Sequence, residues 1–185
     1  MEFAASCGHL DVLKWLHTIK PMICSTEAMD RAAANGHLDV VQWLHHNRTE
    51  GCTTNAMDDA AHYGHLEVVK WLHTNRTEGC TKNALVFAAA NHKINVVKWF
   101  WLHENRTEGS TTKAMDDAAR NGHLEVVKWL HTHRTEGCTA NALDSAATEG
   151  RLEVVQWLWG NSTEGCTTRA IDSAAFHRHD SLVRW

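Results

Sequence analysis

Apolar residues recur along the chain with the spacing of one face of a helix. In residues 64–73, Leu66, Val69 and Leu72 follow one another at intervals of three, whereas Lys70 lies on the polar side. This spacing predicts a short amphipathic helix with one broad apolar stripe. A helix of about ten residues is not stable by itself in water, so its stripe must be buried against other parts of the chain.

Near-copies of this stretch begin at Gly8, Gly36 and Gly122, and the copies align with a period of 28 residues. A period of this size is typical of chains in which neighbouring copies bury each other's apolar faces. We therefore expect one elongated domain over residues 1–185, with the period interrupted once by two extra residues near Phe100. The copies run over residues 1–24 (partial), 25–52, 53–80, 81–110, 111–138, 139–166 and 167–185 (partial).

Each full copy also contains an earlier helix. In the copy 53–80, Thr53 is suited to cap this helix and Gly64 to end it in a left-handed conformation. The small pair Ala60-Ala61 lets neighbouring helices approach closely. The polar stretch after the second helix is too short for a long hairpin. The pattern predicts an all-α fold of stacked antiparallel helix pairs with short loops.

The motif Gly-His-Leu-Glu-Val-Val-Lys, preceded by an Ala-Ala pair, resembles the ankyrin repeat. Asn55–Ala61 stands where that family usually has Thr-Pro-Leu-His-x-Ala-Ala, and the match recurs in phase over essentially the whole chain. The resemblance implies an ankyrin-like helical repeat solenoid. The period is shorter than the usual length of about 33 residues, which implies short loops in place of long β-hairpins. The loop sequence Asn-Arg-Thr-Glu-Gly-Cys-Thr is similar to ankyrin-type arrays of oomycetes.

Composition and charge argue against several kinds of partner. The formal net charge is −4, and Lys and Arg occur singly, so we expect no binding to nucleic acid or to membranes. The sequence has no apolar run of about 18 residues, and its start, residues 1–5, lacks the basic and apolar regions of a secretion signal. The sequence therefore predicts a cytoplasmic protein and leaves nuclear or host-delivered locations open.

Repeated cysteines and histidines suggest disulfides or metal sites, but their spacing argues against both. Stacked helices lie about 8–10 Å apart, too far for a disulfide between equivalent cysteines and too far for two histidines to share a zinc ion. We expect free thiols, no metal site and no cofactor. The family resemblance implies that the His after Gly serves helix entry and contacts between copies. Five of the six cysteines share one repeat position: Cys24, Cys52, Cys80, Cys138 and Cys166.

Tryptophan and aspartate form two further columns. We interpret the Asp column, which includes Asp58 and is interrupted by Val86, as hydrogen-bonding residues at helix starts and between copies. No nucleophile elbow, phosphate loop or triad-like pattern accompanies it, so we expect no enzymatic activity. We interpret the Trp column as a buried ladder, from which Trp101 and Trp159 are excluded. Its members are Trp15, Trp43, Trp71, Trp99, Trp129, Trp157 and Trp185.

Variation between the copies concentrates in the first helix, at the residue before the Ala-Ala pair and at the pair after it. Residues that pack one copy on the next would be held to one shape, so we expect most of the variable residues to point outward. In ankyrin-like stacks the first helices line the concave side. The candidate protein-binding residues are Arg31, Asn35, Asp59, Tyr63, Phe87, Asn91, Asp117, Arg120, Asn121 and Glu149.

These residues predict a non-catalytic scaffold that binds an unidentified protein partner through the concave face. The alternatives are an interaction module of a larger enzyme, signalling protein or secreted effector, and a face that is merely solvated. Met1 falls within a first helix and Trp185 within a second, so the end copies lack the polar caps of most solenoids. This predicts either a longer natural protein or end-to-end self-association through uncapped termini.

Overall fold

The structure is a computed structural model that describes residues 1–19, 24–103, 111–133 and 137–185. In these ranges the regular elements are helices, with no strand, which confirms the all-α repeat fold. None of the described helices is long and apolar enough to span a bilayer. The helices are α1 (Glu2–Ser6), α2 (Leu10–Ile19), α3 (Glu27–Ala34), α4 (Leu38–Asn47), α5 (Thr54–Tyr63), α6 (Leu66–Asn75), α7 (Asn83–Ala90), α8 (Ile94–His103), α9 (Thr111–Asn121), α10 (Leu124–His133), α11 (Ala140–Thr148), α12 (Leu152–Asn161), α13 (Thr168–Phe176) and α14 (Asp180–Val183).

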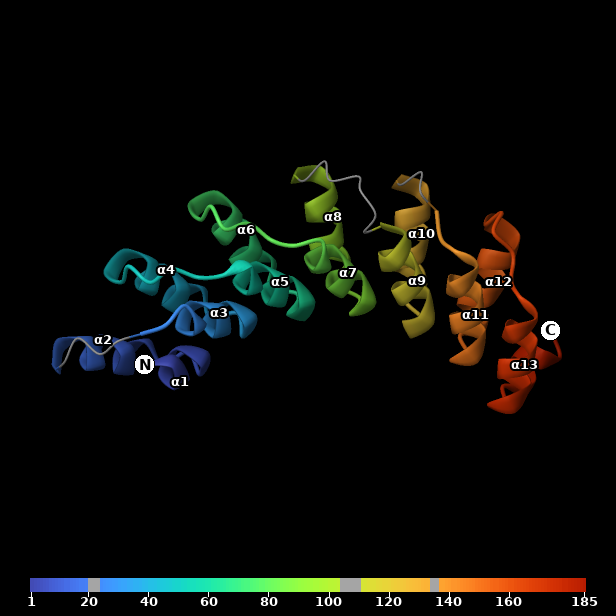
Figure 1. Cartoon of the computed structure of the whole chain (residues 1–185), viewed down its shortest axis with the longest axis horizontal. Coiled ribbons are helices and arrows are strands. Elements are labelled where there is room, and N and C mark those ends of the chain that lie inside the picture. Colours follow the sequence, from blue (N-terminus) through green and yellow to red (C-terminus); the bar gives the residue numbers. More distant parts are fainter. Residues whose placement is uncertain (20–23, 104–110, 134–136) are drawn as a thin grey trace. The chain divides into compact units, whose positions relative to one another are not determined.

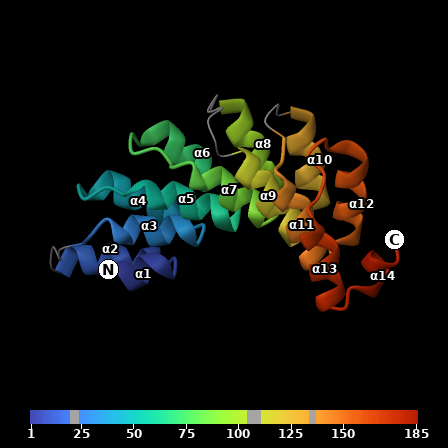
Figure 2. The same ribbon diagram turned by 45° about the vertical axis from the view of Figure 1, so that its right-hand side comes forward.

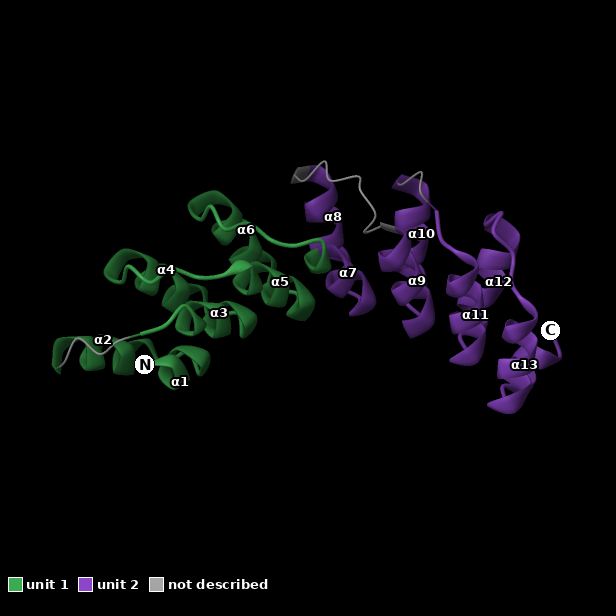
Figure 3. Ribbon diagram, in the orientation of Figure 1, with its two compact units in different colours: residues 1–84 green, residues 85–185 purple. Residues whose placement is uncertain are grey.

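The chain forms two compact units, residues 1–84 and residues 85–185, with the boundary inside α7 (Figure 3). Within each unit, the first helices of successive copies lie side by side in one layer and the second helices in another (Figures 1 and 2). In the first unit these layers are α1, α3, α5 and α2, α4, α6. In the second unit they are α9, α11, α13 and α8, α10, α12. The expectation of one domain over residues 1–185 stays a prediction.

Alanine, valine and leucine form the core of each unit. In the copy 53–80, Ala60 and Ala61 of α5 are completely buried, and so is Val69 of α6, while Leu72 is 1% exposed. Because alanine has a small side chain, adjacent first helices can approach closely, and the larger residues of the second helix fill the remaining space. The apolar stripe predicted from the sequence is therefore the buried face.

The first helix of the copy 53–80 is capped at its start and ended by glycine as the sequence predicts. The Oγ1 atom of Thr53 accepts a hydrogen bond of 3.1 Å from the backbone N–H of Asn55, and Gly64 ends α5 with φ +88°. In the next copy, His92 stands at the glycine position and keeps the left-handed conformation, with φ +59°. A residue with a Cβ atom adopts this conformation at a cost of about 1–2 kcal/mol, so this copy is locally strained.

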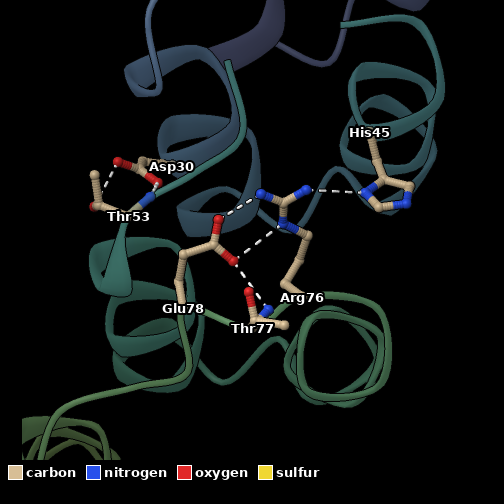
Figure 4. Close-up of polar contacts among 6 residues, drawn as sticks. All are labelled: Asp30, His45, Thr53, Arg76, Thr77 and Glu78. Atoms are coloured by element: carbon tan, nitrogen blue, oxygen red, sulfur yellow. Dashed lines mark hydrogen bonds and ion pairs between the residues drawn. The ribbon is translucent and has the colours of Figure 1, made fainter. Parts of the chain in front are cut away.

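Aspartate and threonine side chains link successive copies at four of the described junctions. The backbone N–H and the hydroxyl of Thr53 each donate to one carboxylate oxygen of Asp30, both at 2.8 Å (Figure 4). The same hydroxyl oxygen accepts the capping hydrogen bond, so one threonine holds the preceding copy and starts its own helix. We call this arrangement the Asp–Thr clamp. It recurs, with hydrogen bonds of 2.6–2.9 Å, at Asp58–Thr81, Asp116–Thr139 and Asp144–Thr167.

The clamp carboxylates lie at the inner side of the first helices, which confirms that the Asp column bonds between copies. Asp58 is only 5% exposed. Burial raises the pKa of Asp30 and Asp116, because a carboxylate loses hydration there, and the hydrogen bonds from threonine oppose this shift. The threonine donors therefore compensate for the cost of burying the carboxylate.

An arginine in the loop after α6 makes a second link between copies. Arg76 forms an ion pair with Glu78, in which its Nε atom donates to Oε2 at 3.2 Å, and the backbone N–H of Thr77 donates to the same carboxylate oxygen at 3.1 Å (Figure 4). Its Nη1 atom also lies 3.2 Å from Nδ1 of His45. A guanidinium can only donate, so this histidine nitrogen accepts. A Cβ atom on Gly51 would lie 2.5 Å from the guanidinium, so glycine leaves space for it.

The Trp column is less buried than predicted. Of its members, Trp99 is buried at 8% exposure, whereas Trp15 and Trp185 are 60% and 56% exposed and the others are half-buried. The reason is the position on the helix: Trp71 lies on the flank of the stripe, one residue before the buried Leu72. The prediction of a fully buried ladder was therefore wrong.

A ring from the last turn of the preceding second helix lies against most of these tryptophans. In the first unit, His17 contacts Trp43 and His45 contacts Trp71, edge to face, with ring centroids 5.4 and 5.1 Å apart. In the second unit Trp101 and Trp159, which we excluded from the column, occupy the position of these histidines. The contacts there are Trp101–Trp129 at 5.8 Å, His131–Trp157 at 5.1 Å and Trp159–Trp185 at 6.3 Å.

The copy 81–110 keeps the regular register through most of its second helix. Phe100 is 2% exposed and occupies the position of Leu72, and α8 has ten residues, as α6 does. We expected the two extra residues to be absorbed at the helix end or in the next loop. That expectation concerns residues 104–110, which lie outside the described residues.

The described cysteines are free thiols, as predicted. Cys24, Cys52, Cys80 and Cys138 are buried, and Cys166 is half-buried. Burial raises the pKa of Cys52 to about 11, because the thiolate would lose its hydration. The thiol therefore stays protonated at neutral pH and acts as a small apolar side chain.

Replacing Asp58 tests the clamp. In Asp58→Ala the buried N–H and hydroxyl of Thr81 lose their acceptor, and we expect the free energy of unfolding to fall by about 2–3 kcal/mol in urea denaturation. The exposed Asp11, in the first turn of α2, provides a matched control, and Asp11→Ala should cost less than about 1 kcal/mol. Equal effects of the two substitutions would contradict a special role for the clamp.

The ion pair in the loop predicts a pH dependence. Hydrogen bonds from Arg76 lower the pKa of Glu78. A carboxylate with a lowered pKa in the folded state stabilises the fold above its unfolded pKa of about 4.3, and this contribution is lost as pH falls through the folded value. Glu78→Gln should therefore reduce the loss of stability below about pH 4.3, measured by thermal unfolding. Adding Arg76→Ala should change this acid dependence no further; an additive effect would show that the two residues act independently.

Candidate protein-binding surface

The candidate residues lie on the first helices or directly after them. The Ala-Ala pairs between them point into the core; Ala32 and Ala33 of α3, for example, are completely buried. Positions next to such a pair on the helix point away from it, because successive residues are separated by about 100°. We call the outward side of the first helices the first-helix face and describe it separately for each unit.

In the first unit, the first-helix face carries charged and aromatic side chains. Arg31 is exposed and forms an ion pair of 2.8 Å with Glu27 one turn earlier. Asp59 is half-buried, and burial raises its pKa. Tyr63 is 56% exposed, and its ring lies 4.5 Å from that of His62 between centroids. Arg31 and Tyr63 are therefore the candidates with the most accessible side chains in this unit.

In the second unit, the first-helix face again combines an aromatic ring with charged groups. Phe87 of α7 is 36% exposed. Asp117 is largely covered and accepts from Lys113 at 2.8 Å, with Arg120 at 4.0 Å on its other side. Arg120 itself is 54% exposed, and Glu149 is exposed at the end of α11. Phe87, Arg120 and Glu149 are thus accessible, whereas Asp117 mainly orients its basic neighbours.

The three candidate asparagines have structural hydrogen bonds that the sequence did not reveal. Asn35 donates to the backbone carbonyl of Ser6 in the preceding copy at 3.1 Å, and Asn121 donates to that of Ala90 at 2.8 Å. Asn91 donates to the carbonyl of Phe87 in its own helix at 2.9 Å. Asparagine recurs at this repeat position, and this recurrence was a signal of a role between copies.

The residue after the glycine turn bonds to the preceding copy. His37, His123 and His179 each place Nε2 2.9–3.0 Å from a backbone carbonyl of that copy. This geometry supports the role in contacts between copies that the family resemblance implied. Arg151 takes the same position and donates from Nε to the carbonyl of Arg120 at 3.3 Å. Arginine can thus replace histidine in this contact, which the sequence analysis did not anticipate.

The second unit also has an apolar groove of about 340 Å³. It lies among α11–α14, and its rim carries the exposed side chains of Trp159, Ile171, Val183 and Trp185. Such a groove can hold apolar side chains. The sequence contains a signal of this groove, because Trp159 stands where most other copies have histidine and Ile171 where they have methionine or leucine.

These surfaces suit noncovalent recognition. The charged side chains of the first-helix face pair with one another, as in Arg31–Glu27 and Lys113–Asp117, and the rings of Tyr63 and Phe87 on this face are exposed. A mixture of aromatic rings and charged groups is typical of protein interfaces. Among the described residues, no three His, Cys, Asp or Glu side chains gather as metal ligands.

Comparison with known proteins agrees with this architecture. Models of "Ankyrin repeats (3 copies)" match residues 57–141 and 85–172, and a model of "Ankyrin repeats (many copies)" matches residues 29–73. No curated protein matches the sequence. The paired helices, the left-handed turn between them and the family models that cover most of the chain show that it belongs to the ankyrin-repeat family.

Proposed function

We propose that the chain is a non-catalytic scaffold that binds a protein partner through its first-helix face. Ankyrin repeats generally serve protein–protein interaction. The observation that carries the proposal is the exposure of Arg31, Tyr63, Phe87 and Arg120, which differ between copies and lie beside completely buried alanines. A face that varies from copy to copy on a constant scaffold supports recognition of a partner.

The chemistry of these side chains supports a protein as the partner. Tyrosine and arginine are enriched among residues that dominate binding energy, each worth ~2 kcal/mol or more at the centre of an interface. The ion pairs Arg31–Glu27 and Lys113–Asp117 place both signs of charge on the same face as the rings. A surface with both signs of charge suits a partner with mixed polar and apolar side chains better than a uniformly charged polymer.

The same arrangement supports a binding role without catalysis. Arg31 and Asp117 form ion pairs with Glu27 and Lys113, and Asn121 donates to a backbone carbonyl, so these side chains hold positions rather than activate a nucleophile. We place this scaffold in the cytoplasm. The alternative, that it is the interaction module of a larger enzyme, signalling protein or secreted effector, uses the same surface.

Substitutions on each unit test the binding face. Once a partner is identified by crosslinking in native extract, Tyr63→Ala and Arg120→Ala together should weaken its binding at least tenfold, measured by calorimetry. The melting temperature should stay unchanged, because both side chains are exposed. Lys128→Ala on α10, an exposed residue of the second layer, is the matched control. Undiminished affinity in the double variant, with a loss in the control, would move the site to the second helices.

Self-association is a second candidate, favoured by the apolar groove of the second unit. We propose that a second copy of the chain fills it with exposed apolar side chains of its own α2. Trp15 and Ile19 there are 60% and 61% exposed. The two contacting surfaces are different, so such contacts would be head-to-tail and could continue into longer assemblies.

Sedimentation velocity over a range of concentrations tests this association. The wild-type chain should form larger species as the concentration rises. Ile171→Glu places a charge in the groove and should keep the chain monomeric, without unfolding it, because Ile171 is 63% exposed. Gln156→Glu, which adds the same charge at an exposed site of α12, should associate like the wild type. A wild-type chain that stays monomeric at high concentration would refute the proposal.

A further inference from the structure

His92 lies at a position where the other copies mostly have glycine. Glycine at this turn leaves room for the ring of the next copy, since a Cβ atom on Gly36 would lie 2.5 Å from Nδ1 of His65. His92 instead keeps φ at +59° with a full side chain. Strained residues of this kind persist where the surrounding structure holds them, and they cluster at functional sites. The strain is therefore a reason to ask what the His92 imidazole does.

The imidazole of His92 faces that of His123 in the next copy. Their Nδ1 atoms are 3.2 Å apart, and the rings are nearly perpendicular, with centroids 4.8 Å apart. Nε2 of His123 lies 2.9 Å from the carbonyl oxygen of Ala90, which can only accept, so Nε2 carries a hydrogen. In neutral His123, the lone pair is consequently on Nδ1 and is directed at His92.

This geometry matches one half of a metal site. Two nitrogens bound to one tetrahedral ion at about 2.0–2.1 Å lie about 3.3 Å from each other. Histidine ligands of metals commonly donate their other ring N–H to a backbone carbonyl, as His123 does to Ala90. We propose that His92 and His123 form a two-histidine site for a divalent transition-metal ion such as Zn²⁺, Ni²⁺ or Cu²⁺.

Binding requires a change of tautomer at one ring. In the metal-free pair, Nδ1 of His92 carries the hydrogen that is shared with Nδ1 of His123. When the ion binds, this proton moves to Nε2 of His92, which is exposed to solvent, and both Nδ1 lone pairs become ligands. Imidazole suits the three ions named, and water supplies the remaining ligands.

Two features limit the affinity. Among residues 1–19, 24–103, 111–133 and 137–185, no third His, Cys, Asp or Glu completes a cluster of ligands. The side chain of Arg151 packs over Gly122, and its positive charge disfavours a second cation near His123. The site is therefore a weak, exchangeable one, and removing the charge in Arg151→Gln should strengthen it.

The proposed ion would link two copies whose junction lacks a clamp carboxylate. His92 belongs to the copy 81–110 and His123 to the copy 111–138. Between them the Asp column carries Val86, which is buried and has no side-chain acceptor. An ion held by one histidine from each copy would stabilise this junction, because the folded state brings the two histidines together.

Titration of the full-length chain with NiCl₂ at pH 7.5 tests the proposal, with calorimetry and thermal unfolding as readouts. His92→Gly restores the residue that most other copies have at this turn. Because glycine adopts the left-handed conformation without strain, the metal-free variant should melt at a temperature equal to or higher than that of the wild type. In the same variant, the Ni²⁺ affinity should fall at least tenfold and the Ni²⁺-induced rise in melting temperature should be lost. This combination separates loss of the ligand from loss of the fold.

His179→Ala is the matched control. His179 makes the same hydrogen bond, to the carbonyl of Thr148, but faces Gly150 in place of a histidine. This variant should melt at a lower temperature and keep the Ni²⁺ response. If His92→Gly keeps the wild-type response, or if His179→Ala loses as much of it, the ions bind only adventitiously to surface histidines and the proposal is overturned. Imidazole ¹⁵N spectra should show the metal-induced shift at Nδ1 of His92 and His123.

Discussion

The Asp–Thr clamp is the interaction on which the repeat structure depends. A short helix pair cannot bury its own apolar stripe, so each copy must be held against its neighbour at a fixed distance and register. The clamp does this with directional bonds: in Asp30–Thr53, two hydrogen bonds of 2.8 Å fix the start of one helix to the side of another. Because the same hydroxyl caps the new helix, docking of a copy and initiation of its first helix are one event. The apolar core supplies most of the stabilisation, and the clamp adds directional bonds at the junctions that carry an aspartate.

The roles of the core and of the links between copies explain which positions are constant and which vary from copy to copy. The second helices and the loops carry the remaining links between copies, such as the ion pair of Arg76 with Glu78 and the ring contacts of the tryptophans, and they tolerate few residue types. Exchange is possible where an aromatic ring is kept, as with Trp101 and His131, which each contact a tryptophan from one repeat position. The outer side of the first helices carries fewer links of this kind, such as the hydrogen bonds of Asn35 and Asn121 to the preceding copy. Selection for binding can act there on residues such as Arg31 and Tyr63 with little effect on stacking.

Most of the fold could be predicted from the sequence, because its signals repeat. The helix pairs, the capping by Thr53, the turn at Gly64 and the bonding role of the Asp column follow from local chemistry that recurs in phase. Predictions were less accurate where the exposure or the hydrogen bonds of a residue depended on residues of a neighbouring copy. The exposure of Trp71 depends on which flank of the stripe the next copy covers, and the bonds of Asn35 and Asn121 depend on carbonyls about thirty residues away. The candidate binding residues were predicted as a face from their variation between copies alone. Variation does not reveal ion pairs, or that Arg120 is exposed whereas its partner Asp117 is largely covered.

The clamp also bears on how such a chain can change in length during evolution. Its two residues are 23 positions apart and belong to successive copies, so a gain or loss of 28 residues outside the copy 81–110 rejoins an aspartate with an equivalent threonine. Unequal recombination within the coding sequence would therefore yield arrays whose new junctions are already complementary. A gain of two residues, as near Phe100, has no such protection and must be tolerated by one copy alone. Because these bonds join neighbouring copies, the number of copies can change freely, whereas the length of each copy is strictly constrained.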